Sequence, residues 1–407
     1  MREYFKLAWR NIWRNKRRTL ITIASVFFAI FFALIMRAMQ IGSYGHWTDG
    51  IIKAYSGFIQ VHKNGYQDDP VLENSFGYDE KLIEKIRGVK NVSGVIPRFE
   101  SFALASTGNQ TKGVMIICID PEQEKQLTHP ETKIVSGSYL DNNSPGALVS
   151  QRLATFLNVE VNDTVTLLSQ GYQGTTAAGI FPVRGIIRMP NPDLDRRIVF
   201  LNLSAGSSLF NAENRLTSLV INLDDPKKLE QTVRHIKSVI DPGSYEALSW
   251  KELNPEIVQL IESDQGSGFL MLGLLYMIVG FGVLGTLIMM TTERKREFGI
   301  MVAVGMQKIK LAALAGTEML LMGFIGILSG IAGSIPVILY FRKYPIRFND
   351  QYKEIFELYG MDPVMPFAFQ FSYFFGQSMI VLVIFILAIL YPIYTVMRIK
   401  EIRALKS

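Results

Sequence analysis

The sequence has 407 residues, enough for two or three structural units at the usual domain size of roughly 100–200 residues. Hydrophobic residues make up 49% of it and charged residues 19%, which indicates a few concentrated apolar segments rather than a chain that is apolar throughout. The net charge of +6 supports nucleic-acid binding only if the basic residues gather on one surface. The single cysteine, Cys118, excludes an intrachain disulfide and leaves no usual Cys/His zinc spacing, so we expect a buried, unreactive thiol.

Residues 1–19 have the pattern of an amphipathic helix at a membrane surface. One helical face carries Phe5, Trp9, Ile12 and Trp13, and another carries Lys6, Arg10, Arg14 and Arg17. Tryptophan opposite cations is typical of a helix that lies in the lipid headgroup layer. A generic basic cluster before a membrane span is the alternative interpretation.

Four apolar stretches are each long enough to cross a bilayer core, which takes about 20 helical residues. They cover residues 20–40, 265–292, 311–341 and 372–397. A signal peptide is the alternative for the first stretch. Its apolar core is longer than that of a signal, however, and no small-residue cleavage site follows Arg37, so we interpret it as a retained anchor. Arg37 is expected to extend to the headgroups at the outer boundary.

Three clusters of Lys and Arg flank these stretches. They are Arg2, Lys6, Arg10, Arg14, Lys16, Arg17 and Arg18; then Arg294, Lys295, Arg296, Lys308 and Lys310; and finally Arg398, Lys400, Arg403 and Lys406. With four crossings all three clusters lie on one side, which the positive-inside rule makes cytoplasmic. Much of the basic excess is therefore topological, and this removes the nucleic-acid interpretation.

Residues 41–264 are predicted to form one large extracytoplasmic domain, and residues 342–371 a shorter outer loop. Strands are expected at 57–62, 99–107, 114–119, 164–168, 183–187, 198–201 and 219–223, and helices at 79–87, 151–157 and 226–240. This order is neither strictly βαβ nor all-β, so the predicted fold is four membrane helices plus an inserted α+β domain. Channels and secondary carriers instead keep most of the chain in the membrane, as repeated helical sets.

The predicted outer domain offers little chemistry. Asp193 and Asp195 beside Arg196 and Arg197 are interpreted as a solvated loop, because no positioned nucleophile or metal set accompanies them. His46 and His62 are too isolated to indicate a metal. We therefore predict no catalytic residue, no metal site and no cofactor on this chain.

The most informative segment is the predicted cytoplasmic link at residues 293–310. A charged start is followed by an apolar helical patch of Phe298, Ile300, Met301, Val302 and Val304, and Gly305 fits a helix stop. An apolar patch that faces water on a short helix is unfavourable unless a partner covers it. The sequence therefore predicts a cytoplasmic protein partner.

The same link, ERKREFGIMVAVGMQKIK, resembles the coupling segment of the FtsX/MacB/LolC–LolE family of ABC permeases. The matching positions are Glu293, Arg294, Glu297, Phe298, Gly299, Ile300, Ala303, Val304 and Gly305. The N-terminal LAWRNIWRNKRRTLIT and the C-terminal YPIYTVMRIKEIRALK are similar to the family's ends, although Val396 and Lys400 replace a small residue and a proline. The segments ALVSQRLATFLNVEVNDTVTL and SWKELNPEIVQLI extend the resemblance into the outer domain.

The resemblance implies a permease subunit that is not itself an enzyme. The 407 residues contain no G-x-x-x-x-G-K-[ST] sequence, so ATP and Mg²⁺ are expected on a separate ABC ATPase subunit that docks on the link. Two permease copies, identical or homologous, would pair in the bacterial inner membrane with their termini in the cytoplasm. ATP binding would then move the outer domain rather than open a central channel.

The resemblance leaves three functions open. The first is release of lipoproteins or other lipidated cargo, because GFIQVHKNGY and SWKELNP look more like the lipoprotein-releasing branch. The second is MacB-like export of a peptide, toxin or drug, and both of these could use a periplasmic carrier or adaptor. The third is FtsX-like activation of a cell-wall hydrolase without transport. Side chains that would suit acyl chains, and equally ordinary membrane lipid, are Phe28, Phe32, Met36, Met39, Met271 and Met277.

The third span carries an ionisable residue, Glu318, about two turns from its start. Such a group is costly in a membrane and usually faces protein. We expect a structural contact with the basic cytoplasmic cluster, because no second acid is present for proton relay. Gly326 and Gly330 form a small-xxx-small pair that is expected to pack this span within the subunit.

Overall fold

The computed structural model describes residues 2–14, 16–142, 145–349 and 364–398. The chain divides into two compact units. The helical unit comprises Met1–Gly45, Ile261–Arg347 and Val364–Ser407, and the α/β unit comprises His46–Leu260 and Phe348–Pro363. The basic tail beyond Arg398 and residues 350–363 of the predicted outer loop at 342–371 lie outside the described residues.

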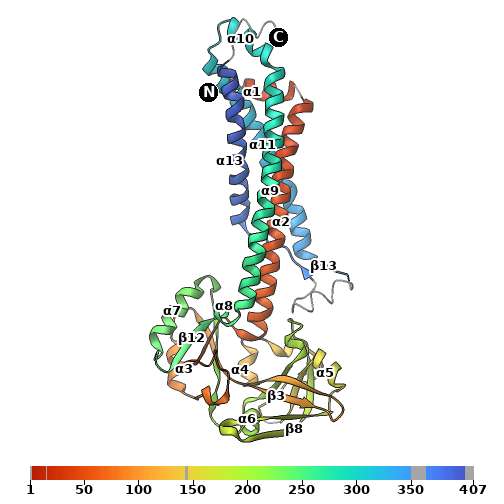
Figure 1. Ribbon diagram of the computed structural model, residues 1–407, viewed down its shortest axis with the longest axis vertical. Helices are drawn as coiled ribbons and strands as arrows, with labels where there is room; N and C mark the ends of the chain where they lie inside the picture. Colours follow the sequence, from red (N-terminus) through yellow and green to blue (C-terminus); the bar gives the residue numbers. More distant parts are fainter. Residues whose placement is uncertain (1, 15, 143–144, 350–363, 399–407) are drawn as a thin grey trace. The chain divides into compact units, whose positions relative to one another are not determined.

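In the residues that the structure describes, the helical unit is built from two short helices and four long ones (Figure 1). Their bounds are α1 Arg2–Arg14, α2 Lys16–Ile51, α9 Pro255–Glu293, α10 Lys295–Ala303, α11 Lys308–Lys343 and α13 Phe371–Met397. The four long helices, α2, α9, α11 and α13, are each long and apolar enough to cross a membrane. The prediction of four membrane helices with an inserted domain is confirmed.

The helices α2 and α9 are longer than their predicted apolar stretches. With 36 residues, α2 is roughly 54 Å long, whereas a bilayer core is about 30 Å thick. Both helices continue beyond the apolar part into the α/β unit, α2 through Gly45 and α9 from Pro255. The hydropathy pattern could not indicate these extensions, because polar residues such as Asp49 and Glu262 interrupt their apolar residues.

Glycines bring α11 close to two neighbouring helices. A Cβ atom added to Gly326 would lie 2.6 Å from Cβ of Val26, and one added to Gly330 would lie 2.8 Å from Cβ of Ile30. The predicted small-xxx-small pair therefore packs α11 against α2 within the subunit. Gly323 makes a similar approach to Phe385 of α13.

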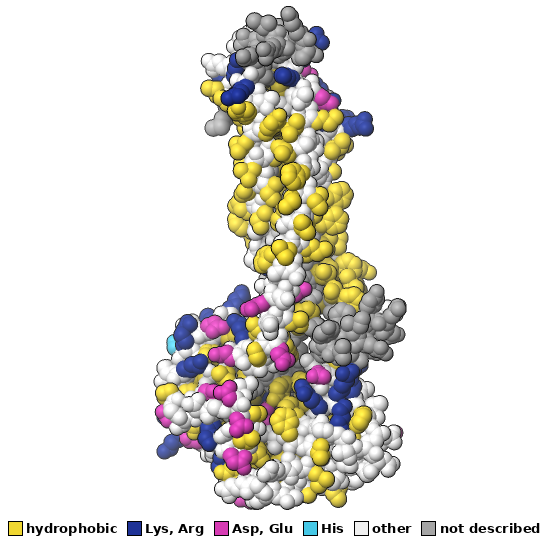
Figure 2. All heavy atoms as spheres, viewed as in Figure 1, with side chains coloured by type: hydrophobic (Ala, Val, Ile, Leu, Met, Phe, Trp, Pro, Cys, Tyr) yellow, Lys and Arg dark blue, Asp and Glu magenta, His cyan; other side chains and the backbone are white. Residues whose placement is uncertain are grey.

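The long helices differ in how much of their apolar surface other residues of the chain cover. Of the most apolar window of α9, 17% is buried, against 33–39% for α2, α11 and α13. Figure 2 shows hydrophobic side chains along the long helices, with Lys and Arg gathered at the end that carries α1 and α10. Apolar surface of this kind is suited to lipid or to another membrane helix.

The α/β unit contains a sheet of ten strands among the described residues, in the order β12-β1-β11-β3-β4-β9-β6-β8-β5, with β7 between β3 and β8. The strands are β1 Ile59–Lys63, β3 Val92–Ser106, β4 Thr111–Ile119, β5 Ile134–Gly137, β6 Ala147–Ser150, β7 Thr164–Gln170, β8 Thr176–Ile187, β9 Ile198–Asn202, β11 Ser218–Leu223 and β12 Tyr245–Ser249. The helices are α3 Glu80–Arg87, α4 Pro121–Lys125, α5 Gln151–Leu157, α6 Leu203–Leu209, α7 Leu229–Val239 and α8 Trp250–Leu253, and a π-helical turn, η1, covers Ile52–Ser56.

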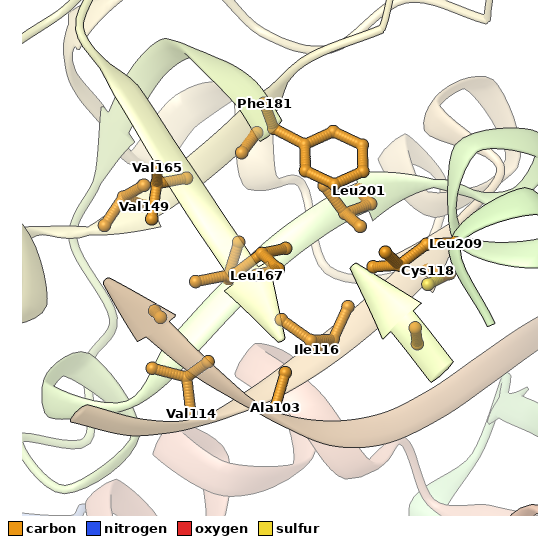
Figure 3. Packing of buried hydrophobic residues seen from close by; sticks show 14 of the residues in the cluster. Ala103, Val114, Ile116, Cys118, Val149, Val165, Leu167, Phe181, Leu201 and Leu209 are labelled. Carbon is orange, nitrogen blue, oxygen red and sulfur yellow. The ribbon is translucent and has the colours of Figure 1, made fainter. Parts of the chain in front are cut away.

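Strand pairing closes part of this sheet into a ring. The pairs run β3–β4–β9–β6–β8–β7 and return from β7 to β3. Alternate side chains of these strands form one buried apolar cluster, in which Cys118 lies near Ile116 and Leu209 (Figure 3). The expected buried thiol is confirmed.

The remaining strands, β12, β1 and β11, pack with α3 and α7 in a second apolar cluster. The first and last strands of the unit are antiparallel neighbours, with Ile59 opposite Ser249 and Lys63 opposite Tyr245. Next to Ile59 and Ser249, beyond this end of the pair, the amide of Trp250 donates to the carbonyl of Phe58 across 2.9 Å. The two chain connections to the helical unit therefore begin at the same end of one strand pair.

One sequence interpretation in this unit is wrong. Asp195 does not belong to a solvated loop, because its side chain is buried and accepts hydrogen bonds from three backbone amides. The donors are Met189 at 2.8 Å and the first two residues of α5, Gln151 and Arg152, each at 3.3 Å. Asp195 therefore caps the start of α5, a contact between positions far apart in the sequence.

Candidate functional site

The link between α9 and α11 is held in the helical unit by a buried ion pair. Nη1 of Arg294 donates to Oε1 of Glu318 across 2.6 Å, and the two residues are only 6% and 3% exposed. The guanidinium of Arg294 also lies 5.1 Å from the ring centroid of Phe298. Since a charge isolated in this environment is strongly unfavourable, the pair fixes the start of α10 against α11.

Phe298 anchors the inner face of α10. It is buried with Leu311, Ala312, Ala315 and Val396, and the partly buried Met301 and Val302 pack on the same cluster. The interpretation of the apolar patch as a single exposed surface is therefore wrong for Phe298. Helical spacing places residues 298, 301 and 302 on one side, and that side is covered by α11 and α13 of the same chain.

The other side of α10 remains exposed. Ile300 and Val304 are 46% and 84% exposed, and Ala303 lies between them on the surface. Ile309, at the start of α11, is also exposed. We call Ile300, Ala303, Val304 and Ile309 the docking surface. It lies on the segment that the buried Arg294–Glu318 pair joins to α11.

Gly305 ends α10 and reverses the chain toward α11. Its φ of +105° is a backbone conformation that residues with a Cβ rarely adopt. Its amide donates to the carbonyl of Val302, and the amide of Met306 donates to the carbonyl of Met301, each across 3.0 Å. This pair of bonds is the Schellman motif, so the predicted helix stop at Gly305 is confirmed.

The N-terminal segment contacts the same link, which the sequence did not reveal. Arg14 pairs with Glu297 at 2.5 Å, and Arg18 pairs with Glu293. Ile12 is buried in the cluster of the long helices, whereas Trp9 and Trp13 are exposed and contact each other edge to face. The first two basic clusters of the sequence therefore lie at one end of the helical unit. Ile12 packs α1 against the long helices, and the two tryptophans point away from them.

The two helices α2 and α9 are also joined near their other end within the helical unit. The hydroxyl of Tyr44 donates to Oδ2 of Asp264 across 2.6 Å, and Nε2 of Gln40 donates to the carbonyl of Asp264 across 3.2 Å. A Cβ atom on Gly268 would lie 2.2 Å from Nε2 of Gln40, so the helices approach closely here. Movement of one helix is therefore passed to the other.

The six side chains predicted to suit acyl chains do not form one enclosed site. Phe28, Phe32, Met271 and Met277 are exposed on α2 and α9, whereas Met36 and Met39 are partly buried. Met39 packs against the cluster of the long helices, and the rings of Phe28 and Phe32 stack at 5.9 Å. Arg37 donates to Oε1 of Gln40 across 2.6 Å.

A buried polar cluster in the α/β unit ties the turn that follows α2 to the sheet. Arg98 of β3 donates to both carboxylate oxygens of Glu124, at 3.0 and 2.5 Å, and to the carbonyl of Tyr55 in η1 at 2.5 Å. The hydroxyl of Tyr55 donates to Glu100 across 2.6 Å. Burial raises the pKa of Glu100 because the desolvated carboxylate is disfavoured. The sequence did not predict this cluster.

His62 lies in the same region and is buried. Its Nδ1 is 2.7 Å from the carbonyl of Thr217, and its ring stacks on Tyr66. Burial lowers the pKa of His62 to about 4. Among the described residues no group of three or more His, Cys, Asp or Glu side chains could hold a metal ion.

Comparisons with known proteins match nearly the whole chain. Residues 19–239 match the MacB-like periplasmic core domain, and residues 269–400 match the FtsX-like permease C-terminal model. The lipoprotein-releasing system transmembrane protein LolC of Xylella fastidiosa is 23% identical over 330 residues, which cover 77% of this chain and 78% of the relative. The pyoverdine export ATP-binding/permease protein PvdT of Pseudomonas syringae is 23% identical over 346 residues, 80% of this chain and 50% of the relative.

Among solved structures, the extracellular domain of the ABC-type transporter YknZ from Gram-positive bacteria is similar, with 12% identity and a TM-score of 0.34. The match covers 47% of this chain and 100% of that domain.

Proposed function

This chain belongs to the family of ABC transporter permeases with a MacB-like periplasmic core domain and an FtsX-like C-terminal segment, and we propose that it transmits ATP-driven motion to its α/β unit. The observation that supports this most directly is the docking surface. Ile300 and Val304 expose apolar side chains to water on a helix that is rigidly supported by the Arg294–Glu318 pair.

The ATPase is proposed to be a separate subunit that binds ATP and Mg²⁺. The sequence contains no P-loop of its own, and the docking surface lies on the segment that resembles the family's coupling helix. By the positive-inside rule, the basic end of the helical unit is proposed to face the cytoplasm of a bacterium, with the α/β unit outside the inner membrane. A second permease copy, identical or homologous, completes the proposed assembly.

The contacts within each unit suggest a route for the motion. A push on α10 reaches α9 and α11 through Arg294, Phe298 and Glu318. The contacts of Asp264 with Gln40 and Tyr44 couple α9 to α2. Within the α/β unit, the bond from Arg98 to Tyr55 connects the turn after α2 to the sheet.

For the cargo, we propose lipoproteins or other lipidated molecules taken from the membrane. LolC relatives are matched over three quarters of both chains, and they belong by name to a lipoprotein-releasing system. The exposed apolar residues of α2 and α9, such as Phe28 and Met277, supply surface suited to acyl chains. Export of another molecule is the second candidate, because PvdT, named for pyoverdine export, matches at equal identity.

The cargo is tested by reconstituting the chain with its ATPase in liposomes that carry a triacylated lipoprotein. ATP-dependent appearance of lipoprotein in the soluble fraction, with a periplasmic carrier present, is the expected result. A lipoprotein without its acyl chains is the matched control and should not be affected. ATP hydrolysis that releases no lipoprotein, but exports a small molecule or activates a cell-wall hydrolase, would overturn the lipoprotein assignment.

A further inference from the structure

A groove in the helical unit combines cations with apolar surface. It has a volume of about 840 Å³ and lies between the end of α1, the start of α2 and the last part of α9. Its lining residues are Arg14, Lys16, Arg17, Arg18, Ile21, Phe281, Gly282, Gly285, Thr286, Met289, Met290 and Glu293. Cavities of this size hold small molecules rather than single waters.

The cations of the groove exceed its acids. Four basic side chains face one carboxylate, Glu293, which already pairs with Arg18. Arg14 pairs with Glu297. Lys16 and Arg17 are exposed and form no ion pair with a carboxylate of the residues that the structure describes. The groove therefore has positive charge available for an anionic ligand.

The apolar part of the groove lies deeper along the spans than the cations do. The cations precede Leu20, where the apolar part of α2 begins, whereas Phe281, Gly282, Gly285 and Met289 lie within the uncharged part of α9. A Cβ atom at Gly282 or Gly285 would meet nothing within 4 Å, so the wall is open there. In a bilayer, this arrangement places cations at headgroup depth and apolar surface at acyl-chain depth.

We infer that this groove binds an anionic phospholipid, with its phosphate at Lys16 and Arg17 and an acyl chain along Phe281 and Met289 of α9. A phospholipid of this kind carries a negative charge that pairs with the cations of the groove and acyl chains that cover its apolar surface. The inference does not depend on the cargo or on ATP hydrolysis.

A second copy of the chain is a poorer occupant on electrostatic grounds. Two membrane subunits related by a two-fold axis along the membrane normal keep each residue at its own depth. If the two grooves faced each other, the basic rim of one would lie opposite the basic rim of the other, and like charges at close range repel. An anionic headgroup removes this conflict.

The test measures lipid binding to the purified full chain by native mass spectrometry, with phosphatidylglycerol and phosphatidylcholine as the two probes. The unmodified chain is expected to retain phosphatidylglycerol preferentially. The variant Lys16→Gln/Arg17→Gln is expected to weaken its binding roughly 10- to 30-fold, since each cation near the surface contributes a factor of several. The matched control Lys6→Gln/Arg10→Gln removes the same charge from exposed positions of α1 outside the groove and should retain most binding.

A second variant, Gly285→Leu, fills the groove without changing its charge and is also expected to reduce phosphatidylglycerol binding. The proposal would be overturned if the Lys6/Arg10 control lost as much phosphatidylglycerol binding as the Lys16/Arg17 variant. It would also be overturned if the unmodified chain retained phosphatidylcholine as well as phosphatidylglycerol. Binding would then not depend on the groove. Efficient disulfide cross-linking of Gly285→Cys between copies in phosphatidylglycerol membranes would also overturn it, because a second subunit would then occupy the groove. The native Cys118 is buried and does not interfere with that measurement.

Discussion

Arg294 and Glu318 are joined across 2.6 Å, although 24 positions separate them, and they link the start of α10 to the interior of α11. The second oxygen of Glu318 has no hydrogen-bond partner among the described residues, so the carboxylate depends on Arg294. Replacing Glu318 with leucine should therefore lower the free energy of unfolding by about 3–5 kcal/mol, because Arg294 loses its buried partner and keeps only a longer contact with the exposed Glu297, at 3.4 Å. Thermal unfolding in detergent measures this loss.

The control for this prediction is the double variant Arg294→Met/Glu318→Leu. Because both charges are absent, it should be distinctly more stable than either single variant. If the single and double variants lose equal stability, the two side chains do not act as a pair.

The docking surface predicts a local defect in partner binding. Ile300→Ser/Val304→Ser should weaken binding of the ATPase about 10- to 100-fold, since burial of each apolar side chain contributes about 1.5–3 kcal/mol when complete. Thermal stability should change little because both side chains are exposed. Binding is measured with purified subunits. Val135→Ser, which changes an exposed side chain of β5, is the control. Unchanged affinity in the double variant would exclude this surface as the contact.

Gly305 predicts a defect of a different kind. Gly305→Ala forces a residue with a Cβ into a φ of +105° and should cost about 1–3 kcal/mol in the turn after α10. We expect weaker stimulation of the ATPase, measured as ATP hydrolysis by the reconstituted complex. Gly273→Ala, in the middle of α9 with open space around it and outside the groove, should be neutral or slightly stabilising. Equal behaviour of the two variants would contradict the role of the turn.

His62 predicts an acid sensitivity of the α/β unit. Its pKa is lowered to about 4 in the folded chain, whereas the unfolded chain binds a proton near pH 6.5. Between these values the unfolded state binds more protons, so the contribution of His62 to stability is complete above pH 6.5 and falls as the pH drops toward 4. The pKa of Glu100 is raised, so the folded chain binds this proton at a higher pH than the unfolded chain does. Acidification therefore increases the contribution of Glu100 to stability.

The comparison of the unmodified chain with His62→Gln separates these two effects. Thermal unfolding followed from pH 7.5 to pH 4.5 should show that the variant loses less stability on acidification, by about 1–3 kcal/mol over this range. Parallel pH profiles for the two proteins would show that His62 is not the sensitive group.

The sequence predicted the elements whose signals are local. The helix α5, Gln151–Leu157, has the predicted bounds. The side chain of Asp79 caps α3, which begins at the next residue. Both helices were predictable because capping residues and apolar spacing are recognised over a few residues. The strands β5, β6 and β12 were not predicted, since their short runs include Ser, Ala, Gly or Glu, which are not typical of strands. Strand β3 begins at Val92, earlier than predicted, because Gly94 and Pro97 interrupt its alternation.

The helix α10 was predicted, but the division of its apolar residues between a covered and an exposed side was not. The sequence indicates that α10 is apolar, but only the packing of α11 and α13 determines that Phe298 is covered and Val304 is not. The partner of Glu318 was predicted only as a basic cluster, and the structure selects Arg294 from it. Contacts such as Arg14 to Glu297 and Arg98 to Glu124 join distant positions, and no local pattern encodes them.

The pairing of β1 with β12 has a mechanical consequence. The first strand of the sheet begins at Ile59 and the last one ends at Ser249, and these residues are direct partners at one end of the strand pair. When the two connecting segments are displaced together, the whole sheet is carried along without strain on this pair. When they are drawn apart, the load falls on one cross-strand bond at a time, as in the opening of a zipper. The sheet should therefore yield easily when these two segments are separated and should move as one body when they are displaced in parallel.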